Sequence, residues 1–350
     1  MIVSSLKLKD FRNHSYLFYD FKSGINVFTG NNAVGKTNVM EAIHYLSLAR
    51  SFRTEHDDEL IKKTKEKAEI EAKITQGEIN RKIQITIFKE GKRVNINNKI
   101  VAKTSELNNV LNVTLFEPKD VMLFKGPPKN RRNFIDISLS KKTPLYLEYY
   151  SRYDKVLRER NEILKSNDID YVLLDATTEM LIKLSEPLVN YRQMYVKDIN
   201  NILNKVTRAL TGTCDKFEII YHPFINGDID FASNAKEAFN RSKDTDIKHK
   251  TTSIGVHRED FEMTLDGRNI GEYGSQGENR IAALALKLSP YFLIEDKEKR
   301  PIIILDDVMS ELDGNHKKRL IEFLKKFEQV FITATKLKID GASQYEIKEK

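Results

Sequence analysis

Over residues 2–29, apolar and polar side chains alternate at the two-residue period of β-strands. The alternation falls into three runs, at residues 2–8, 16–21 and 25–28. From Thr37 to Leu48 the apolar spacing changes to three and four, which predicts an amphipathic helix. Further alternating runs predict strands at 68–74, 82–88 and 113–116. The first third of the chain is therefore predicted to contain many short strands and one early helix.

A break at Gly126-Pro127-Pro128 separates this region from a stretch with helical spacing of apolar residues. Pro144 fits the first turn of a helix, and a second helix is predicted from Tyr171 to Thr211, with a bend near Pro187. At 1.5 Å per residue, a helix of about 20–30 residues extends about 30–45 Å. Two such helices running out and back would form a short arm, although the pattern fits an ordinary helical subdomain equally well.

Strands return near Gly255, and a helix is predicted from about Gly277 to Glu295. The apolar run Ile302–Leu305 then predicts a strand that is buried on both faces, as in parallel sheets. Strands therefore occur at both ends of the chain, and helices dominate its middle.

Composition limits the classes of protein to be considered. The chain has 350 residues, enough for about two domains, and 40% are hydrophobic, which excludes wholesale disorder. A single cysteine, Cys214, excludes an internal disulfide and fits a reducing compartment. No apolar run approaches the roughly 20 residues that span a bilayer. We therefore expect a soluble, cytoplasmic protein without a membrane partner, and its net charge of +7 permits a polyanionic partner without requiring one.

The most specific motif lies between the predicted strand at 25–28 and the helix that follows it. It reads Gly30-Asn31-Asn32-Ala33-Val34-Gly35-Lys36-Thr37 and fits the P-loop pattern G-x-x-x-x-G-K-[ST]. In such a loop, backbone N–H groups and the helix N-terminus receive phosphate oxygens. Lys36 would reach the β- and γ-phosphates, and Thr37 would ligate Mg²⁺.

A second motif, Asp306-Asp307, follows the buried strand Ile302–Leu305. Ligands of open α/β sheets bind at this end of the strands. There Asp306 would support the Mg²⁺, and Asp307 would polarise the attacking water. Asp306 follows Lys36 by 270 residues, so the nucleotide domain must be assembled from both ends of the chain. The guanine-reading pattern N-K-x-D is absent from the sequence, which favours ATP over GTP.

A third motif, Ser275-Gln276-Gly277-Glu278, opens the helix predicted before Ile302. A hydroxyl and a glycine at a helix N-terminus can form an anion site. Because the P-loop already receives the phosphates of its own chain, this second site would be redundant in a monomer. It would be useful if it met the γ-phosphate of ATP bound to a second copy. An ordinary helix N-cap explains the same residues equally well.

Together with Ser310-Glu311-Leu312-Asp313, these motifs resemble the ABC-type ATPase heads of the SMC-like branch, and more closely the RecF family. Further RecF-like stretches are Phe11-Arg12-Asn13, Asn38 with Glu41-Ala42-Ile43, Ser51-Phe52-Arg53, residues 131–136, His257-Arg258-Glu259-Asp260 and Val330-Phe331-Ile332-Thr333. The resemblance implies an α/β fold. Its ABC-type head would be assembled from residues 1–125 and 250–350, with a mostly helical arm inserted at 126–249.

The resemblance also implies roles for the motif residues, with ATP and Mg²⁺ as cofactors. Lys36, Asp306 and Asp307 would be catalytic, and Thr37 and Asp306 would hold the metal. The other nucleotide contacts implied are Arg12, Asn38 and the P-loop residues Gly30, Asn31, Asn32, Ala33, Val34 and Gly35. Ser275, Gln276 and Gly277 would contact the nucleotide of a second subunit. Asp313 would lie in the segment that crosses the dimer interface.

As to function, the resemblance implies a bacterial recombination mediator that dimerises on ATP, hydrolyses it slowly and binds double-stranded DNA without reading its sequence. Junctions between single and double strands are a candidate target. With RecO and RecR it would help RecA to load at gapped or stalled DNA in repair, replication restart and the SOS response. A structural SMC-type DNA tether, a transporter ATPase subunit and a P-loop kinase are the alternatives.

The sequence departs from the RecF pattern at several positions. Ala33 replaces a P-loop glycine, a change that matters only if the backbone angle there is unusual. The glutamine that senses the γ-phosphate in ABC heads is not evident, since Phe116-Glu117-Pro118-Lys119-Asp120 occupies its region. Where such heads often end the last strand with histidine, Thr333 and Thr335 are the nearest polar residues.

Two stretches are rich in basic residues. Residues 126–165 contain ten Lys or Arg against five Asp or Glu, and a second cluster comprises Lys62, Lys63, Lys65 and Lys67. Such surfaces attract duplex DNA, but a solvated protein face has the same composition. Three tyrosines in the first stretch could stack on bases, yet their helical spacing favours a place in the core. They are Tyr149, Tyr150 and Tyr153.

Overall fold

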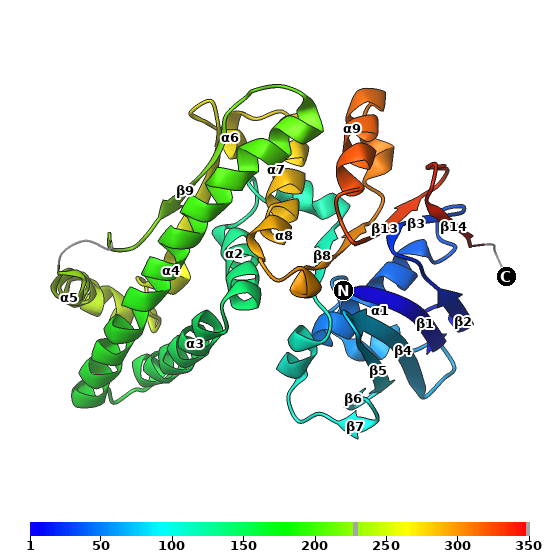
Figure 1. The fold of residues 1–350 in the computed structure, drawn as a ribbon. Coiled ribbons are helices and arrows are strands. Elements are labelled where there is room, and N and C mark those ends of the chain that lie inside the picture. The colour runs from blue at the N-terminus through cyan, green and yellow to red at the C-terminus, as the bar shows by residue number, and fades with distance from the viewer. Residues whose placement is uncertain (227–229, 348–350) are drawn as a thin grey trace. The chain divides into compact units, whose positions relative to one another are not determined.

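The computed structural model describes residues 1–226 and 230–347, apart from the side chain of Ser105. These residues form two compact units (Figure 1). Unit 1 comprises residues 1–120, 208–213 and those from 287 onward, and unit 2 comprises residues 121–207 and 214–286. Both ends of the chain therefore belong to the same unit.

Unit 1 contains an antiparallel sheet with the strand order β2-β1-β4-β5-β6-β7. Its strands are β1 (Ile2–Phe11), β2 (His14–Asp20), β4 (Lys67–Gln76), β5 (Ile79–Phe88), β6 (Gly91–Ile96) and β7 (Lys99–Ile100). Burial alternates along β4 and β5, so that Ile70 and Ile85 lie in the core while the residues on either side of them are partly exposed. The predicted two-residue period is thus confirmed, because one face of this sheet packs against the core and the other faces solvent.

A parallel sheet, with the order β14-β3-β13-β12-β8, joins the two ends of the chain in unit 1. Its strands are β3 (Gly24–Thr29), β8 (Val113–Phe116), β12 (Ile302–Leu305), β13 (Gln329–Ala334) and β14 (Ser343–Glu346). All four neighbouring pairs run parallel. In Figure 1 the blue β3 lies beside the red β13 and β14. The predicted assembly of one domain from both ends of the chain is therefore confirmed.

Three helices accompany this sheet, namely α1 (Lys36–Leu48), α8 (Pro290–Leu293) and α9 (Gly314–Leu324). Helix α1 follows β3, and its apolar side chains share one core with Ile304 of β12 and Phe331 of β13. Short 3-10 helices in this unit lie at residues 57–60, 104–109, 118–122, 297–299 and 309–311, the third of them extending into unit 2. The core thus fixes the start of α1 against the parallel strands.

Unit 2 is mostly helical, as predicted. Its helices are α2 (Pro128–Lys142), α3 (Pro144–Lys165), α4 (Tyr171–Thr211), α5 (Phe231–His249), α6 (Ile270–Tyr273) and α7 (Gln276–Leu288), with a 3-10 helix at 256–258. The ends of α4 and α7 belong to unit 1. A small antiparallel sheet has the order β11-β10-β9, with β9 (Phe217–His222), β10 (Asp260–Leu265) and β11 (Arg268–Asn269). None of the helices in the described part of the chain combines the length and apolarity needed to span a membrane.

Two sequence-based boundaries differ from the structure. The helix predicted at 277–295 is wrong at its end, because α7 stops at Leu288 and Pro290 begins the separate helix α8. Proline cannot donate the hydrogen bond that would continue α7, but it fits the first turn of a new helix. The compact units also divide the chain elsewhere than at residue 249. Residues 250–286 lie in unit 2, since β10 pairs with β9.

A buried ion network joins the helices of unit 2 to β10. The guanidinium of Arg192 is fully buried and binds Asp136 at 2.7 Å and Glu259 at 2.5 Å. Arg131 binds Asp260 through two hydrogen bonds of 2.8 Å. The two RecF-like stretches that contain these residues therefore meet in the core of unit 2. Of the three tyrosines predicted to lie in the core, Tyr153 is fully buried.

We predict that Arg192→Met destabilises the protein by about 3–5 kcal/mol, because it leaves the carboxylates of Asp136 and Glu259 buried without their cation. The measurement is the free energy of unfolding of the chain in urea. As a control, Lys165→Met removes an exposed pair with Glu162 and should change stability by less than about 0.5 kcal/mol. Equal stability of the two variants would contradict this account of the network.

Candidate functional site

The P-loop connects the carboxyl end of β3 to the first turn of α1. Gly35 has a φ of 105°, and a Cβ atom there would lie 2.3 Å from Nε2 of His14, so only glycine fits. No side chain caps the N-terminus of α1. Its first backbone N–H groups therefore remain available for an anion, and the helix dipole favours negative charge at this point.

Lys36 folds back over the loop. Its Nζ donates hydrogen bonds to the backbone oxygens of Gly30, at 2.8 Å, and Asn31, at 2.7 Å. Burial lowers the pKa of the Lys36 ammonium, while the charges of Asp307 and Asp306 oppose this shift. Lys36 thus lies over the P-loop, close enough for the charges of both carboxylates to act on its ammonium group.

Asp306 lies at the carboxyl end of β12 and is buried. Its Oδ1 accepts hydrogen bonds from the hydroxyls of Thr37, at 3.1 Å, and Thr333, at 2.7 Å. Burial raises the pKa of Asp306, and these two hydrogen bonds oppose the shift. The structure therefore brings together Thr37 and Asp306, which the sequence predicted as partners at one site.

Thr333 connects the two aspartates. Besides donating to Asp306, its Oγ1 accepts the backbone N–H of Asp307 at 2.8 Å. Asp307 has a φ of 51° and an exposed side chain. One buried hydroxyl thus fixes both the carboxylate of Asp306 and the turn that presents Asp307. Of the two threonines considered in place of histidine, Thr335 is exposed and Thr333 lies at the site.

Ala33 has a φ of 66°, in the left-handed region that glycine adopts more readily. The unusual backbone angle considered from the sequence is therefore present, and the alanine strains the P-loop. An L-residue in this conformation costs about 1–2 kcal/mol.

A cluster around Glu41 joins α1 to two other segments of unit 1. Glu41 is fully buried in α1 and accepts two hydrogen bonds from Arg12, of 2.9 and 2.7 Å. It also accepts from Ser51 at 2.6 Å and from Arg53 at 3.4 Å. Arg53 in turn donates to Oδ1 of Asn38 at 2.8 Å. Arg12 and Asn38, predicted as nucleotide contacts, are thus tied into this cluster.

Sequence reasoning assigned no role to Glu41. The available signal was an acidic residue within the helix, flanked in the sequence by two stretches that each carry an arginine. Its burial with both arginines appears only in three dimensions.

A third carboxylate follows β8 at the same edge of the sheet. Glu117 comes directly after Phe116, whose backbone oxygen accepts the N–H of Asp306 at 2.9 Å. Burial raises the pKa of Glu117, and a hydrogen bond from Lys119 opposes the shift. Asp120 pairs with Lys287 at 2.5 Å. Charged residues therefore occupy the region where ABC heads carry a glutamine.

Two further predicted elements form helix caps. In unit 2, the Oγ of Ser275 accepts the N–H of Glu278 at 3.2 Å, and the Glu278 carboxylate accepts the N–H of Ser275 at 2.7 Å. Gln276 and Gly277 are exposed. In unit 1, Asp313 caps α9, and hydrogen bonds from His316 lower the pKa of Asp313 to about 2.

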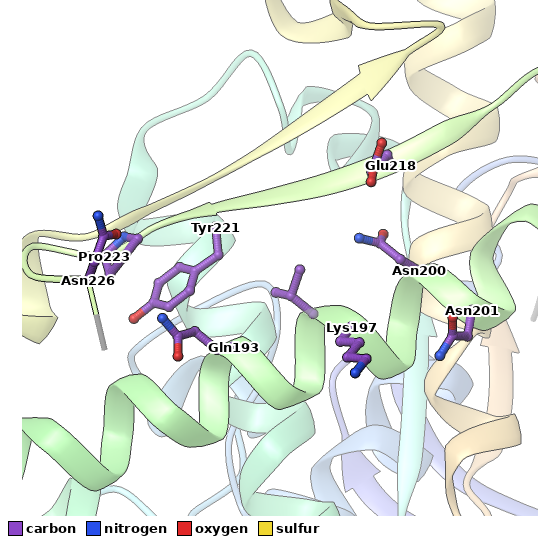
Figure 2. Close-up of a pocket in the computed structure, with 9 residues that line it drawn as sticks. Gln193, Lys197, Asn200, Asn201, Glu218, Tyr221, Pro223 and Asn226 are labelled. Carbon is purple, nitrogen blue, oxygen red and sulfur yellow. The ribbon is translucent and has the colours of Figure 1, made fainter. Parts of the chain in front are cut away.

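A cleft of about 480 Å³ lies in unit 2 between α4 and β9 (Figure 2). The side chain of Asn200 binds both the N–H and the C=O of Ile219, and Asn204 accepts the N–H of Phe217. These amides close the outer edge of β9. Glu218 is the one carboxylate among the described lining residues, and it pairs with Lys216. The cleft therefore carries no set of catalytic groups comparable with the P-loop site.

The sequence matches the family model "RecF/RecN/SMC N terminal domain" over residues 2–344. The chain belongs to the RecF family. Two relatives named "DNA replication and repair protein RecF" come from Clostridium tetani (strain Massachusetts / E88), 36% identical over 342 residues, and Bacillus cereus (strain G9842), 34% identical over 359 residues. The alignments cover 96% and 100% of this chain, and 93% and 95% of the relatives.

Solved structures agree with this RecF assignment. The structure of the "recombination mediator protein RecF-ATP in RecFOR pathway" has a TM-score of 0.88 at 31% identity, covering 98% of this chain and 95% of that chain. An Smc head bound to the C-winged helix domain of ScpA has a TM-score of 0.59 at 17% identity, covering 95% and 89%. The second likeness shows the fold alone. The predicted fold, an ABC-type ATPase head of the SMC-like branch, is confirmed.

We predict that Ala33→Gly stabilises this RecF-family chain by about 0.5–1 kcal/mol, because relief of the left-handed strain exceeds the added freedom of the unfolded chain. Denaturant unfolding of the chain without nucleotide is the measurement. Ala238→Gly is the control; it lies inside helix α5 and should destabilise by about 1 kcal/mol. A loss of stability in Ala33→Gly as large as in the control would refute the strain.

Proposed function

We propose that this RecF-family chain binds ATP with Mg²⁺ at the P-loop and uses it mainly as a switch for dimerisation. The observation that carries the proposal is the meeting of Thr37 and Asp306, from opposite ends of the sequence, beside Lys36. A P-loop, an adjacent hydroxyl and a buried carboxylate are the set that a magnesium nucleotide requires.

The side chains present fit a magnesium ion. Thr37 and Asp306 offer hard oxygen donors, which Mg²⁺ prefers, and they already lie 3.1 Å apart. When bound, the metal would neutralise charge on the phosphates. Lys36 would exchange its two backbone oxygen partners for phosphate oxygens, and the uncapped N–H groups at the start of α1 would receive the rest.

Hydrolysis by this site is proposed to be slow. Asp307 is the exposed carboxylate next to Asp306, and it stands where many ABC ATPases have the longer glutamate. Thr333 holds its backbone, so the side chain would orient a water without a second fixed contact. A modest rate fits a nucleotide that acts chiefly by favouring one assembly over another.

A second copy would complete the site. Gln276 and Gly277 are exposed at the start of α7, and a Cβ atom on Gly277 would meet nothing nearer than Ser275 Oγ at 4.0 Å. A side chain would therefore fit there, so the packing of its own chain does not require a glycine. Close approach of a phosphate from a second subunit would explain the glycine. Asp313, exposed at the start of α9, is proposed to lie at the same interface.

The biological role proposed is that of the named relatives, DNA replication and repair, in the cytoplasm. With RecO and RecR, the ATP-bound dimer would bind gapped or stalled DNA and help RecA to load. A long SMC-type tether is disfavoured by the arm, whose longest helix has 41 residues and so extends only about 60 Å.

For the nucleotide site, we predict that Lys36→Ala lowers ATP affinity at least about 100-fold, because the ammonium supplies the main charge on the β- and γ-phosphates. Calorimetry with Mg·ATP measures this. Lys22→Ala, an exposed lysine of the same unit, should bind as the parent does. Unchanged affinity in Lys36→Ala would place the nucleotide elsewhere.

For the dimer, we predict that Ser275→Arg retains ATP binding but loses ATP-dependent dimerisation, because the long side chain blocks the approach of a second subunit. Light scattering with ATP, ADP and a slowly hydrolysed analogue measures this. Ser233→Arg, on the exposed side of α5, is the matched control and should dimerise normally. A parent chain that remains monomeric with ATP would favour a P-loop kinase.

A further inference from the structure

The antiparallel sheet of unit 1 has one face in solvent, and its residues can be followed from strand to strand. Side chains of directly paired residues lie on the same face of an antiparallel sheet. From Lys7 and Lys9 of β1, the register leads to Phe18 and Tyr16 of β2. In the other direction it leads through Glu71 and Glu69 of β4 to Gln84 and Thr86 of β5, and then to Asn95 and Arg93 of β6. We call this surface the outer sheet face.

Cations outnumber carboxylates on the outer sheet face. Six cationic residues lie on it, namely Lys7, Lys9, Lys67, Lys73, Lys82 and Arg93. The carboxylates are Asp20, Glu69 and Glu71. Glu69 pairs with Lys67 at 2.8 Å, and Glu71 pairs with Lys82 at 2.9 Å. Among the residues that the structure describes, no ion pair links Lys7, Lys9 or Lys73 to a carboxylate.

The positive charge of this face shifts the pKa of one of its own carboxylates. A hydrogen bond from Lys67 lowers the pKa of Glu69, and the charges of Lys67, Lys9 and Lys7 lower it further. The lysines of β1 thus act on β4 across the sheet. Clustered cations of this kind attract a polyanion and release its counterions.

Aromatic rings flank the cations. Tyr16 and Phe18, on the edge strand β2, are 54% and 50% exposed. The Nζ of Lys7 lies 5.9 Å from the centre of the Tyr16 ring, and Arg93 lies 6.0 Å from the ring of Phe88 on the far side. Proteins that bind single-stranded nucleic acids have large exposed rings beside cations, because an unpaired base can stack on a ring while its phosphate contacts a lysine.

The basic stretch at 126–165 is a weaker candidate. Arg131 and Arg160 are buried in ion pairs with Asp260 and Asp246. Most of its exposed cations pair with carboxylates of unit 2, namely Lys142, Arg152, Lys155, Arg158 and Lys165. The ordinary interpretation of that stretch, a solvated face, is therefore favoured.

We propose that the outer sheet face binds single-stranded DNA, with phosphates at Lys7, Lys9 and Lys73 and bases stacked on Tyr16 and Phe18. The proposal rests on the proposed function in DNA repair and specifies the surface and the form of DNA. Charge complementarity indicates a polyanion, and the rings distinguish its form, because the base faces of a duplex are already stacked and cannot cover them.

The test uses the full chain with ATP and two fluorescent probes, a short oligothymidine and a duplex of equal length. Tyr16→Ala/Phe18→Ala should weaken oligothymidine binding about tenfold or more and leave duplex binding within about twofold. Lys7→Gln/Lys9→Gln should reduce the slope of log affinity against log salt for oligothymidine by about 1.4. All four side chains are exposed, and urea unfolding checks that the variants are folded.

Matched controls come from unit 2. Tyr171→Ala removes a ring of similar exposure, 55%, and Lys236→Gln/Lys248→Gln removes two exposed charges, so both should bind as the parent does. Parent-like binding of oligothymidine by the sheet variants would overturn the proposed surface while leaving the proposed function intact. Equal losses for oligothymidine and duplex would overturn the single-strand preference. A parent chain that binds neither probe at low salt would contradict the proposed function itself.

Discussion

Parallel pairing of buried strands from opposite ends of the chain is the constraint on which the site depends. β3 pairs with β13, β13 with β12, and β12 with β8, so that the turns after three of these strands meet at one edge. The hydrogen bond between Thr37 and Asp306 spans 269 positions of sequence and exists only because of this pairing. β12 and β13 are buried along their whole length on both faces, as is usual for strands of a parallel sheet.

Local patterns were sufficient to predict the motifs and much of the fold. The start of α1, the buried strand before Asp306 and the long helix from Tyr171 to Thr211 are short-range signals that the structure confirms. The nucleotide roles of the P-loop and of Asp306-Asp307 stay predictions. The glycine at position 35 is explained by its backbone angle and by the imidazole that fills the space beside it.

The remaining features depend on contacts that no local pattern encodes. The role of Glu41 requires two arginines from separate segments, and that of Thr333 requires the pairing of β12 with β13. The extent of unit 2 follows from the pairing of β9 with β10 and from Arg192, whose two carboxylate partners are far away in sequence. Gly277, and Lys7, Lys9 and Lys73 of the outer sheet face, are exposed or without an ion pair among the described residues, and for each we propose a phosphate from outside the chain as the partner.

The central claim is that Thr37 and Asp306 together hold the magnesium of a bound nucleotide. The most direct measurement is the ATP affinity of the parent chain and of Asp306→Asn, each with Mg²⁺ and with a chelator. The account predicts that Mg²⁺ strengthens ATP binding by the parent but not by the variant, since the amide replaces an anionic ligand with a neutral one. An equal effect of Mg²⁺ on both proteins would contradict it.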